Sequence, residues 1–218
     1  MNNIVVINGS PKPKYSASGY FIGQIEVIMK TEFSVYQATK LINPENNSEM
    51  IADILKADTL LIVFPLYIDS LPAPLIKTLM LLEQGAAAAA GSKLPKVYAI
   101  CNCGFFEAEN NRLALDIIRH FCVRSGMSWG YGIGIGAGGF VSSQSKESFG
   151  GPMVKINAAL GELAKSMKTH CALEQNLFIV PYIPRALYLR GANKAWEKAA
   201  EKYGQRDALR ARPHLEGG

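Results

Sequence analysis

Short apolar runs alternate along the chain with stretches in which apolar residues recur at helical spacing. The apolar runs lie at residues 4–7, 33–38, 58–64, 96–102 and 130–136. Continuous apolar runs of this length are typical of strands that are covered on both faces. The helical spacing between them predicts that helices separate the strands. The pattern therefore predicts a five-stranded parallel sheet with right-handed crossovers and helices on both faces.

The loop after the first strand has the composition of a phosphate site. The strand ends at the turn signal Asn8-Gly9-Ser10-Pro11, and residues 12–19 bring two lysines and further hydroxyls directly before a helix. Hydroxyls and free N–H groups then converge where the helix dipole adds about half a positive charge. One serine would merely cap the helix. Because Ser10, Ser16 and Ser18 together exceed what capping requires, the sequence favours phosphate binding.

Two further loops leave predicted strands at the same edge of the sheet. The third strand stops at Pro65, and Pro72 restarts a helix. In open parallel sheets the carboxyl ends of the strands bind ligands, so a flat apolar ligand could lie against Leu66 and Tyr67. The alternative is an ordinary connecting loop with a surface tyrosine. A second polar and aromatic loop, residues 102–107, follows the fourth strand.

The first loop also decides between two doubly wound strand orders. It contains no Gly-x-Gly-x-x-Gly, the signature of the dinucleotide-binding order. Residues 134–139 have that glycine spacing, but they come late and lack the acidic residue expected about 20 positions further on. We therefore predict the flavodoxin-like order 2-1-3-4-5 for residues 1–174. Residues 175–218 are expected to form a C-terminal extension with an amphipathic helix.

Composition excludes several classes of function. The chain of 218 residues is 49% hydrophobic and 19% charged with a net charge of +5, and it has no basic stripe interleaved with aromatics, so we expect no nucleic-acid groove. The four cysteines lack zinc-ligand spacing and are expected to be free thiols in a reducing compartment, without a metal. The start of the chain lacks the pattern of a signal peptide, which makes the cytoplasm the expected location.

Three motifs then occur in the order found in a known family. Residues 9–18, 64–73 and 102–107 resemble the flavodoxin-like NAD(P)H-dependent FMN reductases, and the resemblance covers residues 4 to 140. Residues 184–196 also resemble the ends of some members. The resemblance implies FMN as cofactor, NADH or NADPH as co-substrate, and hydride transfer to a small acceptor such as a quinone, an azo or nitro compound, a flavin or a metal ion.

The resemblance also implies roles for individual residues. The first loop would hold the flavin phosphate through Ser10, Lys12, Ser16, Ala17 and Ser18. The second would lie along the flavin ring through Phe64, Pro65, Leu66, Tyr67 and Ile68. The third would close the far edge of the ring through Asn102, Cys103, Gly104 and Phe105. Substrate contacts are expected from Glu107 and Gly138. No catalytic acid or base is assigned, since hydride transfer itself requires none.

Two other functions are also compatible with the sequence. One is a flavodoxin-type electron carrier that binds FMN without using a nicotinamide, and another is a regulator that kept the fold and lost the flavin. We expect a homodimer, because Phe140 and Phe149 lie on a glycine- and serine-rich segment and would be exposed unless a partner covers them. The aromatic tail is expected to pack against the protein, with a membrane interface as the competing use.

Overall fold

The structure is a computed structural model that describes residues 2–12, 14–43, 45, 47–89, 91–144 and 150–211. Residues up to Tyr182 form one compact unit, and residues from Ile183 onward form a second. None of the described helices is both long enough and apolar enough to cross a membrane.

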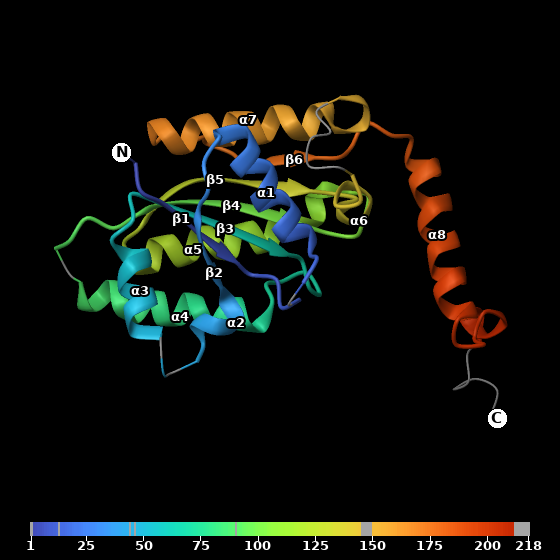
Figure 1. The fold of residues 1–218 in the computed structure, drawn as a ribbon, viewed down its shortest axis with the longest axis horizontal. Coiled ribbons are helices and arrows are strands. Elements are labelled where there is room, and N and C mark those ends of the chain that lie inside the picture. The colour runs from blue at the N-terminus through green and yellow to red at the C-terminus, as the bar shows by residue number, and fades with distance from the viewer. Residues whose placement is uncertain are drawn as a thin grey trace. The chain divides into compact units, whose positions relative to one another are not determined.

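The first unit is built on a parallel sheet of six strands (Figure 1). The strands are β1 (Ile4–Asn8), β2 (Ser34–Gln37), β3 (Thr59–Pro65), β4 (Lys96–Asn102), β5 (Ser128–Ile135) and β6 (Leu177–Ile179). Their order is β2-β1-β3-β4-β5-β6, and every pairing is parallel. The predicted flavodoxin-like order 2-1-3-4-5 is confirmed, with one strand added at its end.

Helices cover both faces of this sheet (Figure 1). They are α1 (Ala17–Met29), α2 (Ala38–Leu41), α3 (Asn47–Leu55), α4 (Ala73–Ala88), α5 (Arg112–Ser125), α6 (Gly138–Val141) and α7 (Val154–Thr169), with short 3₁₀ turns η1 (Ala108–Asn111) and η2 (Gly151–Met153). Helices α1 and α7 lie together on one face, and α3, α4 and α5 lie on the other. The second unit contains α8 (Arg185–Glu201) and the turn η3 (Asp207–Arg210).

Strand β3 shows why the apolar runs are continuous. Leu60, Ile62 and Phe64 point into the apolar core beneath α4 and α5, while Leu61 and Val63 point into the core beneath α1 and α7. All five side chains are completely buried. A strand buried on both faces needs an apolar side chain at every position, which removes the alternation seen in half-exposed strands.

The alternating glycines of β5 make room for the protein's own side chains. A β-carbon at Gly130 would lie 2.3 Å from the ring of Tyr98, and one at Gly132 would lie 2.6 Å from Leu115. Glycines that alternate along a strand indicate that another group approaches the strand closely. The approaching groups in the structure are core residues.

The sixth strand was not predicted, because the three residues of β6 are too short for a periodic signal. It pairs with the end of β5, and the N–H group of Gly136 donates to the carbonyl oxygen of Ile179 at 3.0 Å. Residues 175–182 therefore belong to the first compact unit, although we expected them in the C-terminal extension. The unit ends at Tyr182, eight residues beyond the expected boundary at Glu174.

Candidate functional site

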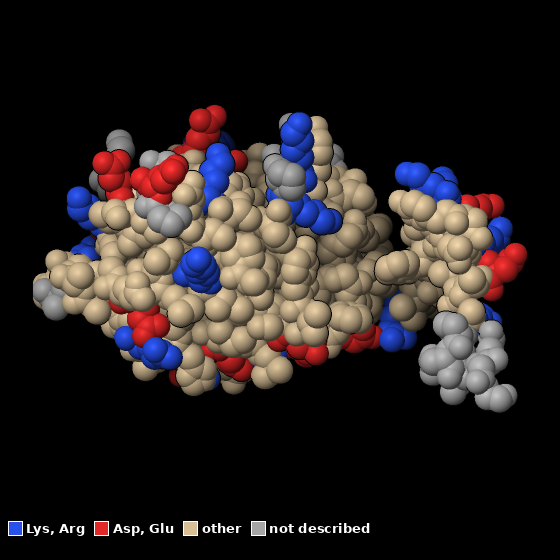
Figure 2. All heavy atoms as spheres, turned by 90° about the horizontal axis from the view of Figure 1, so that it is seen from below, with Lys and Arg blue, Asp and Glu red and all other residues tan. Residues whose placement is uncertain are grey.

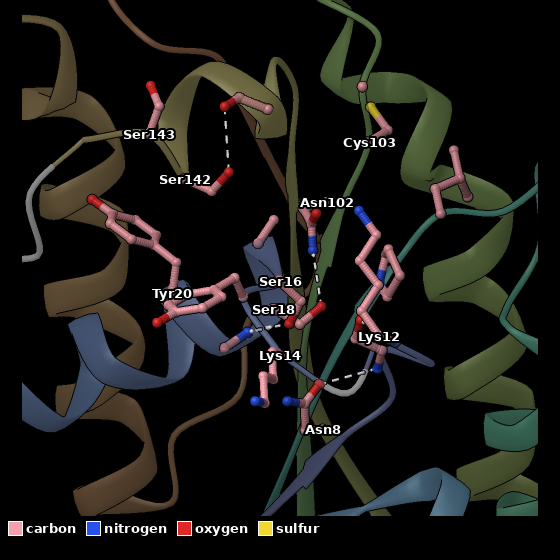
Figure 3. Close-up of a pocket in the computed structure, with 18 of the residues that line it drawn as sticks. Asn8, Lys12, Lys14, Ser16, Ser18, Tyr20, Asn102, Cys103, Ser142 and Ser143 are labelled. Atoms are coloured by element: carbon pink, nitrogen blue, oxygen red, sulfur yellow. Dashed lines mark hydrogen bonds between the residues drawn. The ribbon is translucent and has the colours of Figure 1, made fainter.

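Three loops at the carboxyl edge of the sheet enclose one cavity of about 840 Å³ (Figure 3). They follow β1, β3 and β4, and α6 contributes a fourth wall. The lining residues are Asn8, Ser10, Lys12, Lys14, Tyr15, Ser16, Ala17, Ser18, Gly19, Tyr20, Gln37, Pro65, Leu66, Tyr67, Asn102, Cys103, Gly104, Gly139, Ser142, Ser143 and Gln144. The volume is within the range of pockets that bind small molecules and cofactors, roughly 300 to 1,000 Å³.

Side-chain and backbone hydrogen bonds fold the first loop. The Oδ1 atom of Asn8 accepts a bond from the N–H group of Ser10 at 3.0 Å, and the Oγ atom of Ser10 accepts one from the N–H group of Lys12 at 3.3 Å. Gly9 passes so close to β3 that a β-carbon there would lie 2.7 Å from that of Phe64. The asparagine–glycine pair thus fixes the turn that leads from β1 into the cavity.

The end of this loop forms an electropositive corner at the start of α1. The Oγ atom of Ser16 caps the helix by accepting a bond from the N–H group of Gly19 at 3.0 Å. Within the described part of the chain, the N–H groups of Ala17 and Ser18 have no hydrogen-bond acceptor. These free donors and the helix dipole favour an anion at this corner. The side chain of Lys12, which is exposed, and that of Lys14 add positive charge beside it.

Asn102 connects the three loops at the floor of the cavity (Figure 3). Its Nδ2 atom donates to the Oγ atom of Ser18 at 3.4 Å and to the carbonyl oxygen of Phe64 at 3.0 Å. The backbone carbonyl oxygen of Asn102 accepts a hydrogen bond from the N–H group of Leu66 at 2.8 Å. The buried side chain of Asn102 therefore holds the start of α1, where the first loop ends, close to the end of β3, where the second loop begins.

Another part of the cavity lining is uncharged. It consists of Pro65, Leu66, Tyr67 and Cys103, whose thiol donates to the carbonyl oxygens of Phe105 and Glu107 in the third loop. Burial raises the pKa of the Cys103 thiol, although a hydrogen bond donated by the Nδ2 atom of Asn111 at 3.4 Å acts in the opposite direction. The group therefore remains a neutral thiol at neutral pH. A polar, cationic corner and an apolar wall suit a ligand with an anionic end and a flat apolar body.

The second loop contains a strained turn. Tyr67 and Ser70 exchange two backbone hydrogen bonds of 2.9 and 3.1 Å across Ile68 and Asp69. Both central residues have positive φ angles, 50° for Ile68 and 56° for Asp69. This is the type I′ arrangement, which asparagine and glycine favour and which a β-branched residue adopts at a cost. The side chain of Ile68 is 99% exposed and does not line the cavity, so its predicted contact with a ring is not supported.

We expect Ile68→Asn to stabilise the protein by about 1 kcal/mol. Asparagine tolerates the left-handed conformation that costs other residues roughly 1 to 2 kcal/mol, and no packing is lost at an exposed position. Urea denaturation measures this change as a higher urea concentration at the unfolding midpoint, with an unchanged dependence of the unfolding free energy on urea. Ile68→Val is the matched control, because valine keeps the branched β-carbon and should leave the midpoint unchanged. Equal stabilisation by both variants would contradict the assignment of strain.

The structure brings most of the predicted site residues together. Besides Ile68, four of them do not line the cavity. Phe64 is completely buried in the core and reaches the site only through its carbonyl oxygen. Phe105 and Glu107 lie on the exposed outer side of the third loop. Gly138 lies beneath that loop, where its N–H group donates to the carbonyl oxygen of Cys103 at 2.8 Å, and its neighbour Gly139 lines the cavity instead.

Sequence reasoning missed the wall supplied by α6. Gly139 of α6 lines the cavity together with Ser142, Ser143 and Gln144, which directly follow the helix and which no motif marks. This four-residue helix follows Ala137, whose positive φ of 54° turns the chain back toward the site. Phe140 from the same segment packs against the core and is only partly exposed, whereas Phe149 lies outside the described residues. The homodimer stays a prediction, and the partly covered Phe140 does not by itself require a partner.

Comparison with known proteins gives matches at the level of structure alone. No family model and no curated protein matches the chain. An NADH:FMN oxidoreductase in its apo form has 16% identity and a TM-score of 0.56, covering 84% of this chain and 97% of its own. An oxidoreductase from Corynebacterium diphtheriae has 14% identity and a TM-score of 0.55, with 76% and 94% covered. An NADPH-quinone reductase from P. pentosaceus has 15% identity and a TM-score of 0.52, with 74% and 96% covered.

These similarities and the strand order establish the fold. The first unit of the chain has the flavodoxin-like fold, and the matched proteins align over nearly their whole length. A fold of this kind hosts more than one activity, so the function of this chain depends on what its cavity binds.

Proposed function

We propose that this protein is an FMN-dependent oxidoreductase, which moves hydride from NADH or NADPH to a small organic or metal-ion acceptor. The observation that supports it best is one cavity that combines a cationic, donor-rich corner with an apolar wall. In the flavodoxin-like fold this edge of the sheet, next to β1 and β3, is the ligand-binding edge. The membership in the FMN reductase family that the motifs suggest is part of the same proposal.

The residues present fit the two ends of FMN. Its phosphate would be held by the N–H groups of Ala17 and Ser18, the hydroxyl of Ser10, and the side chains of Lys12 and Lys14. The dianionic phosphate suits this corner because every group in it is either a hydrogen-bond donor or a cation. The hydroxyl of Ser16 already accepts a bond from Gly19 and retains its own proton for donation.

The flavin ring would lie against the wall formed by Pro65, Leu66 and Tyr67. Tyr67 is 41% exposed, which leaves part of its ring surface available for stacking. The backbone of Asn102, Cys103 and Gly104 would border the ring's other edge. When bound, the flavin accepts a hydride and passes electrons to the acceptor, and the protein's part is to orient it and keep one face accessible.

The names of the structural matches agree with this proposal. They include an NADH:FMN oxidoreductase and an NADPH-quinone reductase, both of which use a nicotinamide as reductant by name. Since their identity to this chain is 16% or less, they support the class of reaction and leave the acceptor open.

A titration followed by a turnover assay tests the proposal. The purified protein should be yellow or should take up FMN stoichiometrically, seen as a change in flavin absorbance and quenching of its fluorescence. NADH and NADPH are then supplied separately with a small quinone, and oxidation should depend on bound FMN. A protein that binds FMN but oxidises neither nicotinamide would be an electron carrier. A protein that binds no FMN would contradict the proposal entirely.

A further inference from the structure

Helix α8 is amphipathic from Tyr188 onward. At 100° per residue, one side collects most of its apolar residues, and the other collects its charged residues except Arg185, which lies in the first turn at the angle of the apolar side. The apolar side consists of Tyr188, Leu189, Ala192, Ala195, Trp196 and Ala199. The helix contains no buried residue, and the side chain of Trp196 is 69% exposed. The predicted packing of this apolar side against the protein stays untested.

The second unit carries most of the protein's excess positive charge. Residues 183–218 contain eight lysines and arginines against four acidic residues, a formal charge of +4. Residues 1–182 contain fifteen against fourteen, a formal charge of +1. Figure 2 shows the second unit end-on, with charged side chains gathered on one side of it and uncharged residues on the other.

A turn after α8 places one cation beside its two acidic residues. Gly204 has a positive φ of 65°, and the N–H group of Gln205 donates to the carbonyl oxygen of Ala200 at 2.9 Å. This reversal brings the guanidinium of Arg206 to 3.8 Å from Glu197 and 3.7 Å from Glu201.

The basic residues of the charged side are left without such partners. Among the described residues, no carboxylate lies within ion-pair distance of Arg190, Lys194 or Lys198. The charged side of α8 is therefore effectively cationic.

We propose that α8 binds flat on an anionic lipid membrane. A helix with aromatic residues on its apolar side and lysines and arginines on its polar side is the pattern of an interfacial helix. Tyrosine and tryptophan favour the boundary between headgroups and hydrocarbon, and each nearby cation adds about 1 kcal/mol on an anionic surface, close to a fivefold gain in affinity.

A second copy of the chain is a poorer partner for this helix. Pairing two α8 helices would bring two cationic segments together, and the first unit, at +1, offers no excess of negative charge to either. Anionic lipids supply both, because their headgroups carry the negative charge and their acyl chains form the apolar layer beneath.

The two tryptophans of the chain allow a direct test. In Trp129→Phe the only tryptophan left is Trp196, so its emission reports on α8. The emission should shift to the blue with vesicles that contain phosphatidylglycerol and should not shift with phosphatidylcholine alone. Raised salt should reverse part of the shift. If Trp129→Phe fails to fold, co-sedimentation of the unaltered chain with the same vesicles gives the same comparison.

Variants separate the contribution of each side of α8. Replacing Arg190, Lys194 and Lys198 by glutamine should weaken co-sedimentation about 100-fold, because three cations contribute roughly 1 kcal/mol each. The matched control replaces the exposed lysines Lys77, Lys165 and Lys168 of the first unit and should change binding little.

The apolar side has a control within the same helix. Leu189→Ser should weaken binding, whereas Leu187→Ser, on the charged side, should not. Equal effects of the two serine variants, or equal binding to neutral and anionic vesicles, would overturn the proposal. So would a protein that sediments with neither vesicle and instead dimerises through Leu189, since α8 would then serve a second copy.

Discussion

Ser16→Asp is expected to lower FMN affinity at least about 100-fold while leaving the protein without FMN as stable as before. Aspartate caps helices as well as serine does, and its charge favours a helix N-terminus, so α1 should persist. In the presence of FMN the same carboxylate faces a phosphate dianion. Two unit charges about 4 Å apart repel by about 4 kcal/mol at an effective dielectric constant near 20, and salt screens part of this.

Ser16→Asn, in which asparagine is the neutral isostere of aspartate, separates the effect of charge from that of helix capping. Ser16→Asn supplies a side-chain oxygen to the N–H group of Gly19 without a negative charge, and FMN affinity should stay within a few fold of the unaltered protein. Flavin fluorescence titration measures the affinities, and urea denaturation without FMN checks the fold. Retained affinity in Ser16→Asp would mean that the phosphate binds elsewhere in the cavity.

Gly136→Ala should destabilise the protein by about 3 kcal/mol. A β-carbon at this position would lie 2.1 Å from the carbonyl oxygen of Phe106 and 3.1 Å from the backbone nitrogen of Ala108. Both contacts are with backbone, which cannot rotate away as a side chain can. Phe106 and Ala108, which the added β-carbon would displace, lie in the third loop of the cavity or directly after it. The variant should therefore also bind FMN less tightly, and the stability gained on adding FMN should decrease.

Gly139→Ala is the matched control three residues away. No atom lies within 4 Å of a β-carbon built there, and the position is exposed, so urea denaturation should show a change of less than about 0.5 kcal/mol. A change below about 1 kcal/mol in Gly136→Ala would contradict the close approach between the end of β5 and the third loop.

The sequence predicted the parts of the fold whose signals are local. Strand β4 was predicted at residues 96–102, and the structure has it at Lys96–Asn102, because a continuous apolar run as short as this favours a buried strand over a helix. The cavity's first loop was recognisable for a similar reason, since Asn8, Ser16 and Ser18 stand next to one strand and one helix. Within α5, by contrast, Leu113 and Ile117 have the spacing typical of a buried helix face but lie exposed, 62% and 39%.

The features that sequence could not predict depend on distant contacts. The wall from α6 exists because Ala137 turns the chain, and alanine carries no turn signal of its own. Ile68 occupies a type I′ turn, which β-branched residues rarely adopt, so its conformational preference did not predict this turn. Asn102 was placed in the site correctly, but its bonds to Phe64 and Ser18 join residues 38 and 84 positions away.

The strand order also bears on how the chain can assemble during synthesis. After β3 has joined β1, each later strand is added to the edge left by the strand before it, from β4 to β6. No strand has to be inserted between two that are already paired. A growing chain can therefore extend its sheet in one direction as residues emerge, which shortens the time that any unpaired edge awaits its neighbour. The three-residue β6 then leaves only a short edge at which another chain could add.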